Sequence, residues 1–168
     1  MSVGLLDVNM LIALSWPSHL HHRTAQAWFS KHAARGWATC PLTQCAFLRI
    51  SSNPKIIPEA VTPAEAFDLL RQIVAQKHHT FWPDDIAVLD EDIPRSLVGG
   101  HRQITDAYLL GLAIRHDGRL VTLDKGILTL AHPGSSCLQA LELVADEPLY
   151  DGVDSGEPFH GAIGSDLL

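Results

Sequence analysis

The chain has 168 residues, of which 46% are hydrophobic, and carries a formal net charge of −7. This length and composition suit one globular domain with a buried core, and no apolar run approaches the roughly 20 residues that span a bilayer. The first residues, MSVGLLDVN, lack the basic segment of a secretory signal, and the isolated cysteines Cys40, Cys45 and Cys137 favour buried thiols over disulfides or zinc, so we expect a cytoplasmic protein without membrane contact.

The first predicted elements are a strand, two consecutive helices and a second strand. VGLL (3–6) is a short apolar run typical of a buried strand, and NMLIALSW then predicts a helix that ends before Pro17. A second helix is expected over about 19–34, with Ser18 as its N-cap and Gly36 at its end. Its inner face is expected to carry three apolar residues, Leu20, Ala27 and Trp28. WATC (37–40) predicts the second strand.

The middle of the chain predicts two more helices and a third strand. LTQCAFLRI favours a helix that stops before Asn53-Pro54. TPAEAFDLLRQIVAQ begins with a capping box, in which Thr62 is the N-cap and Glu65 its reciprocal partner, and Pro63 occupies the first helical position. TFW (80–82) is the third expected strand, and the acidic segment PDDIAVLDEDIP that follows predicts an exposed loop.

The remaining pattern completes an α/β fold. After Gly99-Gly100, a helix is predicted from about 103 to 116, followed by strands RLVTLD (119–124) and LELV (141–144). Strands that alternate with helices at spacings too long for hairpins predict a central, mostly parallel sheet within one domain, residues 1–145. Residues 146–168 contain six of the 19 acids and no Lys or Arg, which predicts an acidic, flexible tail and leaves the domain itself nearly neutral.

Three acids are expected to meet at one edge of this sheet. Ligands bind beyond the carboxyl ends of parallel strands, and Asp7 follows the strand VGLL as Asp124 follows LVTL. Asp106 lies in ITDAYLLGLAI, near the start of the helix that precedes the Asp124 strand, so the same edge is expected for it. Each acid alone also fits a turn, a helix cap or a favourable place in the helix macrodipole. Together they would repel one another unless a divalent cation neutralised them, and such oxygen ligands suit Mg²⁺ or Mn²⁺.

Four segments together resemble a known family. LLDVNMLIAL, TCPLTQCAFLRISSNP, ITDAYLLGLA and LVTLDKGI, in this order over about residues 3–145, are similar to those of a PIN domain, specifically a VapC-type toxin ribonuclease of a type II toxin–antitoxin system. The resemblance implies a compact α/β/α sandwich. It also implies Mg²⁺- or Mn²⁺-dependent endonucleolytic cleavage of RNA, with tRNA or another structured RNA as the expected substrate.

The resemblance assigns residues by position. Asp7, Asp106 and Asp124 match the metal-binding and catalytic acids, and Asn9 matches a polar position whose hydrogen bond would orient the first acid. Many relatives carry Glu where this chain has Gln44, a neutral amide that can still coordinate through its oxygen or hold a metal-bound water. Because Gln44 brings no negative charge, a second metal ion is expected to bind less tightly. The acids of segment 83–94 are one source of a substitute for the missing Glu.

The implied mechanism uses metal-activated water, so products with 5′-phosphate and 3′-hydroxyl ends are expected. Four side chains that flank the motifs are candidates for phosphate contacts, although each also fits a solvated surface charge: Arg49, His101, Arg102 and Lys125. The histidines of HLHH (19–22) have no companion ligands and are expected at the surface.

The resemblance also implies partners. Toxins of this family usually dimerise and bind a small antitoxin of the VapB type, which we expect against the first helices, including Trp16. Two other functions stay open from the sequence. One is a catalytically weakened PIN domain that binds RNA or a protein without cutting, which Gln44 allows. The other is a phosphatase with Asp7 as an aspartyl nucleophile, although such sites often have a second Asp where this chain has Asn9.

Overall fold

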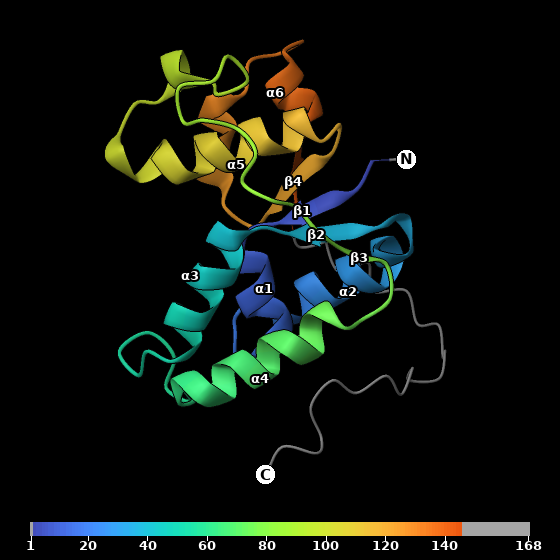
Figure 1. The fold of residues 1–168 in the computed structure, drawn as a ribbon, viewed down its shortest axis with the longest axis vertical. Coiled ribbons are helices and arrows are strands. Elements are labelled where there is room, and N and C mark those ends of the chain that lie inside the picture. The colour runs from blue at the N-terminus through green and yellow to red at the C-terminus, as the bar shows by residue number, and fades with distance from the viewer. Residues whose placement is uncertain (1, 146–168) are drawn as a thin grey trace, which may run out of the picture.

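The computed structural model of the protein describes residues 2–145, and the predicted acidic tail, residues 146–168, lies outside the described residues. A five-stranded sheet forms the centre, with strand order β3-β2-β1-β4-β5 and every neighbouring pair parallel (Figure 1). The strands are β1 (Gly4–Leu6), β2 (Trp37–Thr39), β3 (His79–Phe81), β4 (Arg119–Thr122) and β5 (Leu141–Leu143). The expectation of a mostly parallel sheet is confirmed.

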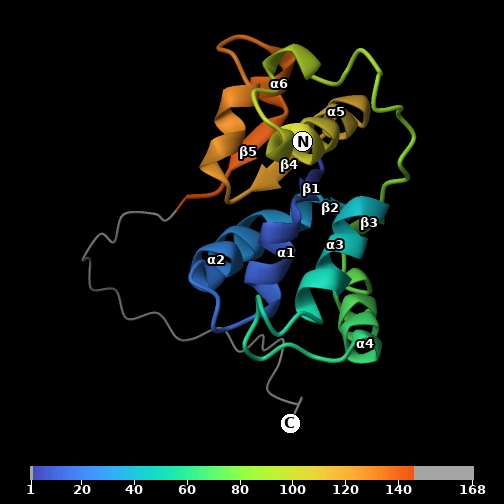
Figure 2. The same cartoon turned by 90° about the vertical axis from the view of Figure 1, so that its left-hand side faces the viewer.

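Helices cover both faces of the sheet, which makes an α/β/α sandwich (Figures 1 and 2). One face carries α1 (Val8–Ser15), α2 (His22–His32), α3 (Pro41–Ser51) and α4 (Pro63–Val74). The other carries α5 (Ile104–Arg115) and α6 (Ser136–Gln139). Short 3₁₀ segments complete the chain: η1 (Ala33–Arg35), η2 (Arg95–Leu97), η3 (His101–Gln103) and η4 (Lys125–Leu130).

Alternation along the strands divides the interior into two cores. Leu5, Ala38 and Leu120 face α5 and α6, whereas Leu6, Trp37 and Val121 face α1 to α4. Successive residues of a strand point to opposite faces, so a strand covered on both sides is apolar there, as VGLL and the Leu120-Val121 pair of β4 are. The strands are short, which brings the first turns of the helices that follow them close to the same edge.

Local signals in the sequence explain where several helices begin and end. The capping box of α4 is confirmed, because the Thr62 hydroxyl accepts from the Glu65 N–H (3.3 Å) and Glu65 Oε2 accepts from the Thr62 N–H (2.8 Å). Gly36 directly follows η1 with φ of +98°, a conformation that glycine adopts without strain, and it leads into β2. The exposed loop predicted for 83–94 has no helix or strand.

The predicted second helix differs from α2. The helix begins at His22 rather than near residue 19, because residues 17–21 form turns, and the Ser18 hydroxyl bonds to Glu59 instead of capping. Leu20 therefore lies in the turn and is 88% exposed, and Ala27 is exposed as well. Ala25 is the buried residue of α2 and Trp28 packs against the same core, so the predicted inner face was right at Trp28 and wrong at Leu20 and Ala27.

Two short helical segments were not predicted, and one cysteine is exposed where a buried thiol was expected. The sequence analysis did not predict η4 or α6, which have only six and four residues and therefore show no periodicity. Cys40 and Cys137 are buried free thiols as expected, but Cys45, on α3, is exposed. Among residues 2–145, no helix is both long and apolar enough to cross a membrane.

Candidate active site

The carboxyl edge of the sheet between β1 and β4 is the topological switch point of the fold. The chain moves outward from β1 to β2 and β3, then crosses to β4 and β5 on the other side of β1. Leu6 pairs with Val121, so Asp7 directly after β1 faces Thr122 at the end of β4. Open α/β sheets form their ligand sites at such a point.

Asp7 is fixed by hydrogen bonds at both carboxylate oxygens. Its Oδ1 accepts from the Val8 N–H (2.6 Å), which makes it the N-cap of α1. Its Oδ2 accepts from the Asn9 amide (2.8 Å) and the Thr122 hydroxyl (2.7 Å). The side chain is 6% exposed. Burial raises the pKa of Asp7 and the charge of Asp124 raises it further, whereas the hydrogen bonds from Thr122, Val8 and Asn9 act against this rise.

Asn9 and Thr122 form the frame around Asp7. The Asn9 amide also donates to the Thr122 hydroxyl oxygen (2.8 Å), and its own oxygen accepts from the Leu123 N–H (3.1 Å). Thr122 in turn accepts from the Asp124 N–H (3.1 Å), so one hydroxyl links two of the three acids. Thr122 was missed by the sequence analysis. The sequence feature that could have identified Thr122 is a hydroxyl residue at the end of β4, the strand that pairs with the strand before Asp7.

Asp106 lies in the first turn of α5 and is half-buried. Burial, together with the charges of Asp7 and Asp124, raises the pKa of Asp106 from 3.8 to about 6. The charges of Asp7 and Asp124, which are distant from Asp106 in sequence, therefore act on Asp106 at this edge of the sheet. No hydrogen-bond donor or cation among residues 2–145 compensates the Asp106 carboxylate.

Asp124 is the most open of the three acids. It is exposed, and its Oδ1 accepts from the Gly126 N–H (2.7 Å), which caps η4. Asp7 and Asp124 are therefore both helix caps, the structural role that the sequence also allowed for them. Both also face the same edge of the sheet. Within residues 2–145, no three His, Cys, Asp or Glu side chains are grouped tightly enough to hold a metal ion together.

Comparisons with known proteins identify the family of the chain. The family model described as "PIN domain" matches residues 4–133. The chain belongs to the PIN domain family. It is 50% identical over 129 residues to Ribonuclease VapC38 of Mycobacterium tuberculosis, covering 77% of this chain and 90% of that protein. It is 45% identical over 132 residues to Ribonuclease VapC39 (78% and 95%) and 44% identical over 134 residues to Ribonuclease VapC44 (79% and 94%), both of M. tuberculosis. The predicted family and fold are confirmed.

Gln44 of this PIN domain lies near the start of α3, which follows β2 at the same edge. Its amide N–H donates to the hydroxyl of Thr39, the last residue of β2 (2.9 Å). The hydrogen bond of Gln44 therefore runs toward the sheet rather than to one of the three acids.

The predicted phosphate contacts are all exposed. Arg49 lies on α3, His101 and Arg102 lie in η3 immediately before α5, and Lys125 begins η4 next to Asp124. None of the four forms an ion pair with another described residue. They remain candidates for contacts with a polyanion at this edge of the PIN domain.

Among the acids of segment 83–94, Asp84 acts on Tyr108 and on Cys40 directly after β2, whereas two others pair away from the three acids. Asp85 pairs with His116 (3.1 Å) and Asp90 with Arg115 (3.5 Å), at the far end of α5 from Asp106. The pKa of Asp106 responds to Asp7 and Asp124 alone among the described acids. In the HLHH segment, the His22 ring bonds to the Ala13 carbonyl (2.7 Å), which ties α2 to α1.

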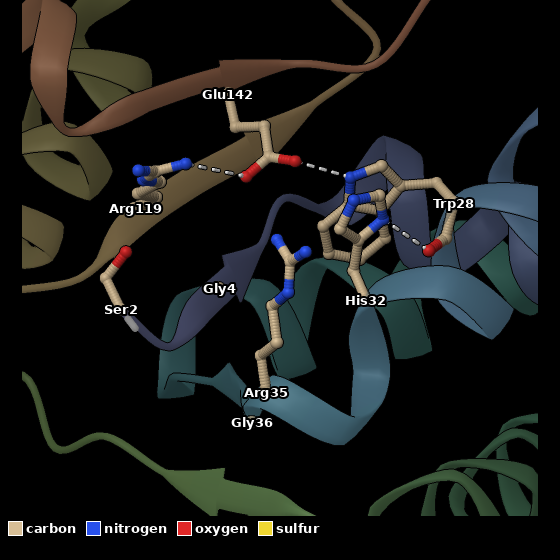
Figure 3. A pocket seen from close by; sticks show the side chains of 8 residues that line it. All are labelled: Ser2, Gly4, Trp28, His32, Arg35, Gly36, Arg119 and Glu142. Carbon is tan, nitrogen blue, oxygen red and sulfur yellow. Dashed lines mark hydrogen bonds and ion pairs between the residues drawn. The ribbon is translucent and has the colours of Figure 1, made fainter.

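A pocket of about 90 Å³ lies at the opposite, amino-terminal edge of the sheet, near Gly4, Gly36 and Arg119 (Figure 3). There the Trp28 indole N–H donates to Glu142 (2.6 Å), whose other oxygen lies 3.6 Å from Arg119. Figure 3 shows these groups directed at one another. They link α2 to β4 and β5, and the pocket is remote from the three acids.

Proposed function

We propose that the protein is a divalent-metal-dependent endoribonuclease of the VapC type, the toxin of a VapBC-type toxin–antitoxin pair, and that it cleaves structured RNA. The observation that supports the proposal is that Asp7 and Asp124 follow neighbouring strands at the switch point, and that burial and the charges of these two acids raise the pKa of Asp106. The relatives named ribonuclease support the reaction class.

The residues present fit Mg²⁺ or Mn²⁺ by their chemistry. Asp106 offers a carboxylate without a donor or cation among residues 2–145, and Asp7 and Asp124 add carboxylate oxygens at the same edge. Hard oxygen ligands of this kind are those that Mg²⁺ and Mn²⁺ prefer. Asp7, Asp106 and Asp124 would hold the ion, which when bound supplies an activated water and charge neutralisation at the scissile phosphate.

Two of the acids have different roles in this proposal. Asp7 is held at both oxygens, so it provides a fixed acceptor whose orientation does not change during the reaction. Asp106 has no hydrogen-bond donor among residues 2–145, so its carboxylate oxygens are free to bind the cation or to orient a water molecule. Attack by water rather than the 2′-hydroxyl leaves 5′-phosphate and 3′-hydroxyl ends.

The RNA backbone would lie across the same edge. Lys125 adjoins Asp124, and His101 and Arg102 lie one turn before Asp106, so all three can reach phosphates on either side of the cleaved bond. Arg49, farther along α3, would contact a phosphate at greater distance from that bond. Each such contact contributes to affinity and to its dependence on salt, without reading the base sequence.

A VapB-type antitoxin and a second copy of the chain are the proposed protein partners. A small apolar pocket of about 20 Å³ between α1, α2 and α4, lined in part by Leu14, Phe29 and Ile73, lies beside the first helices where we expect the antitoxin. An amphipathic segment can place apolar side chains in such a pocket.

The test is cleavage of structured RNA in the presence of Mg²⁺ or Mn²⁺. We expect cleavage by the wild-type protein, none with a chelator, and a loss of at least a hundredfold in Asp7→Asn with the circular-dichroism spectrum retained. Asp68→Asn, the same change at an exposed position of α4, serves as the matched control. Absence of metal-dependent cleavage by folded wild-type protein would favour a module that binds RNA or protein without cutting it.

The aspartyl phosphatase alternative is disfavoured by one observation. Both oxygens of Asp7 accept hydrogen bonds and the side chain is 6% exposed, so it makes a poor nucleophile. Incubation with a small phosphate ester would leave a covalent phosphoenzyme only if this alternative held.

A further inference from the structure

Three polar side chains form a line from the predicted catalytic edge to the outer strand of the sheet. Gln44 lies on α3, Thr39 ends β2, and His79 begins β3. Gln44 Nε2 lies 2.9 Å from Thr39 Oγ1, and Thr39 Oγ1 lies 2.9 Å from His79 Nε2. Thr39 is completely buried, so its hydroxyl depends on these two neighbours.

The donors and acceptors of these groups determine the direction of the two hydrogen bonds in the line. The Thr39 hydroxyl has one proton, and it accepts from the Gln44 amide N–H, so its own proton points to His79. His79 Nε2 must then carry a lone pair, with the ring proton on Nδ1. His79 packs against Trp37 at 4.6 Å between ring centroids, and burial lowers the pKa of His79, which favours the neutral ring that this direction requires.

The direction also determines how Gln44 presents its amide. Because Nε2 faces Thr39, the amide oxygen is the free end of the side chain, and no donor among residues 2–145 bonds to it. A carboxylate at position 44 has no proton to donate, so both hydrogen bonds would run in the opposite direction. Thr39 would donate to the carboxylate, and His79 would have to donate to Thr39. The surroundings of Gln44 are thus arranged for an amide.

We propose that Thr39 and His79 are positioning residues that hold Gln44 with its amide oxygen directed to the divalent cation or to a water bound to it. This inference rests on the proposed function. Thr39 ends β2 beside Leu6, the residue before Asp7, so Gln44 on the following helix belongs to the same edge as the three acids. An amide oxygen is a hard neutral ligand, and fixing its orientation before binding reduces the entropy lost on coordination.

The direction of the line is tested without metal or RNA. Long-range ¹H–¹⁵N correlation on the ¹⁵N-labelled full chain at pH 7.5 identifies which ring nitrogen of His79 is protonated, with His79→Gln to assign its signals. We expect the proton on Nδ1 in the wild type and on Nε2 in Gln44→Glu. A proton on Nε2 in the wild type would overturn the proposal, whether or not the protein proves to be a ribonuclease.

The role toward the cation is tested by Mn²⁺ affinity, measured by electron paramagnetic resonance with Mn²⁺ alone. We expect Thr39→Val, which has nearly the same shape but no hydroxyl, to weaken Mn²⁺ binding roughly tenfold, and Thr39→Ser to restore it. In a Gln44→Leu background, Thr39→Val should cause no further loss, because its effect passes through Gln44.

A purely structural role for Thr39 predicts a different result. Thr39→Val would then lower the melting temperature while leaving Mn²⁺ affinity unchanged, or would weaken affinity equally in both backgrounds, and either result overturns the positioning role. Loss of RNA cleavage with this coupling intact would instead count against the proposed function alone.

Discussion

Because Asp106 is half-buried and lies near two other acids, we predict that neutralising it stabilises the metal-free protein and removes its activity. Burial and the charges of Asp7 and Asp124 raise the pKa of Asp106 from 3.8 to about 6. A raised carboxyl pKa means that folding favours the protonated form. Stability from this group is therefore fully present below pH 3.8 and is lost as the pH rises through about 6, so at pH 8 the ionised side chain destabilises the fold.

The magnitude follows from the pKa difference. The pKa of Asp106 rises by about 2 units, from 3.8 to about 6. At about 1.36 kcal/mol per unit, this corresponds to an upper limit of about 3 kcal/mol in the free energy of unfolding. Solvent screens a half-buried group, which reduces this to about 1.5 kcal/mol. Asp106 also lies in the first turn of α5, where a negative charge gains about 0.5 kcal/mol from the macrodipole. We therefore expect Asp106→Asn to be about 1 kcal/mol more stable at pH 8, a rise of roughly 2–4 °C in melting temperature.

Differential scanning calorimetry with a chelator at pH 5 and pH 8 measures this effect. The gain should be smaller at pH 5 than at pH 8, and Mg²⁺ should stabilise the wild type more than the variant. Glu91→Gln, which removes one charge from an exposed loop residue, controls for net charge and should show no comparable gain. A destabilised Asp106→Asn at pH 8, or an equal gain at both pH values, would refute the mutual repulsion inferred for this edge.

Three further predictions concern the frame and the fold. Thr122→Val leaves Asp7 without its hydroxyl donor, so we expect about 1–2 kcal/mol less stability by urea unfolding and weaker Mn²⁺ binding. Thr62→Ala removes the α4 cap, far from this edge, and should cost about 1 kcal/mol in the same assay without affecting RNA cleavage. Gly118→Ala would place a Cβ 2.3 Å from the Trp82 ring, and the resulting strain should lower stability by about 1–3 kcal/mol in calorimetry.

The fold and the positions of the three acids were predictable because they depend on pattern alone. Apolar runs alternating with amphipathic segments predict a parallel sheet, and the carboxyl ends of its strands select Asp7 and Asp124 without any knowledge of side-chain geometry. The capping box at Thr62 was predictable for a similar reason, since both partners lie within one turn of helix.

Features that depend on contacts between distant segments were not predictable. Thr122 bonds to Asp7 across 115 residues, and only the register of β1 with β4 brings them together. The inner face of α2 was predicted correctly at Trp28 but wrongly at Leu20, because turns delay the start of the helix past Leu20. Likewise, the sequence offers Gln44 as a ligand but gives no sign that Thr39 holds its amide.

The amide at position 44 is consistent with the electrostatics of this edge. Burial and the charges of Asp7 and Asp124 already raise the pKa of Asp106 to about 6. A fourth carboxylate would add to this repulsion, and a second cation would be required to compensate it. With Gln44, one divalent cation would neutralise most of the charge, and a second cation would need a further counter-charge, which an RNA phosphate would provide. The chain is therefore expected to hold one cation in the absence of RNA and to complete a two-metal arrangement only on its substrate.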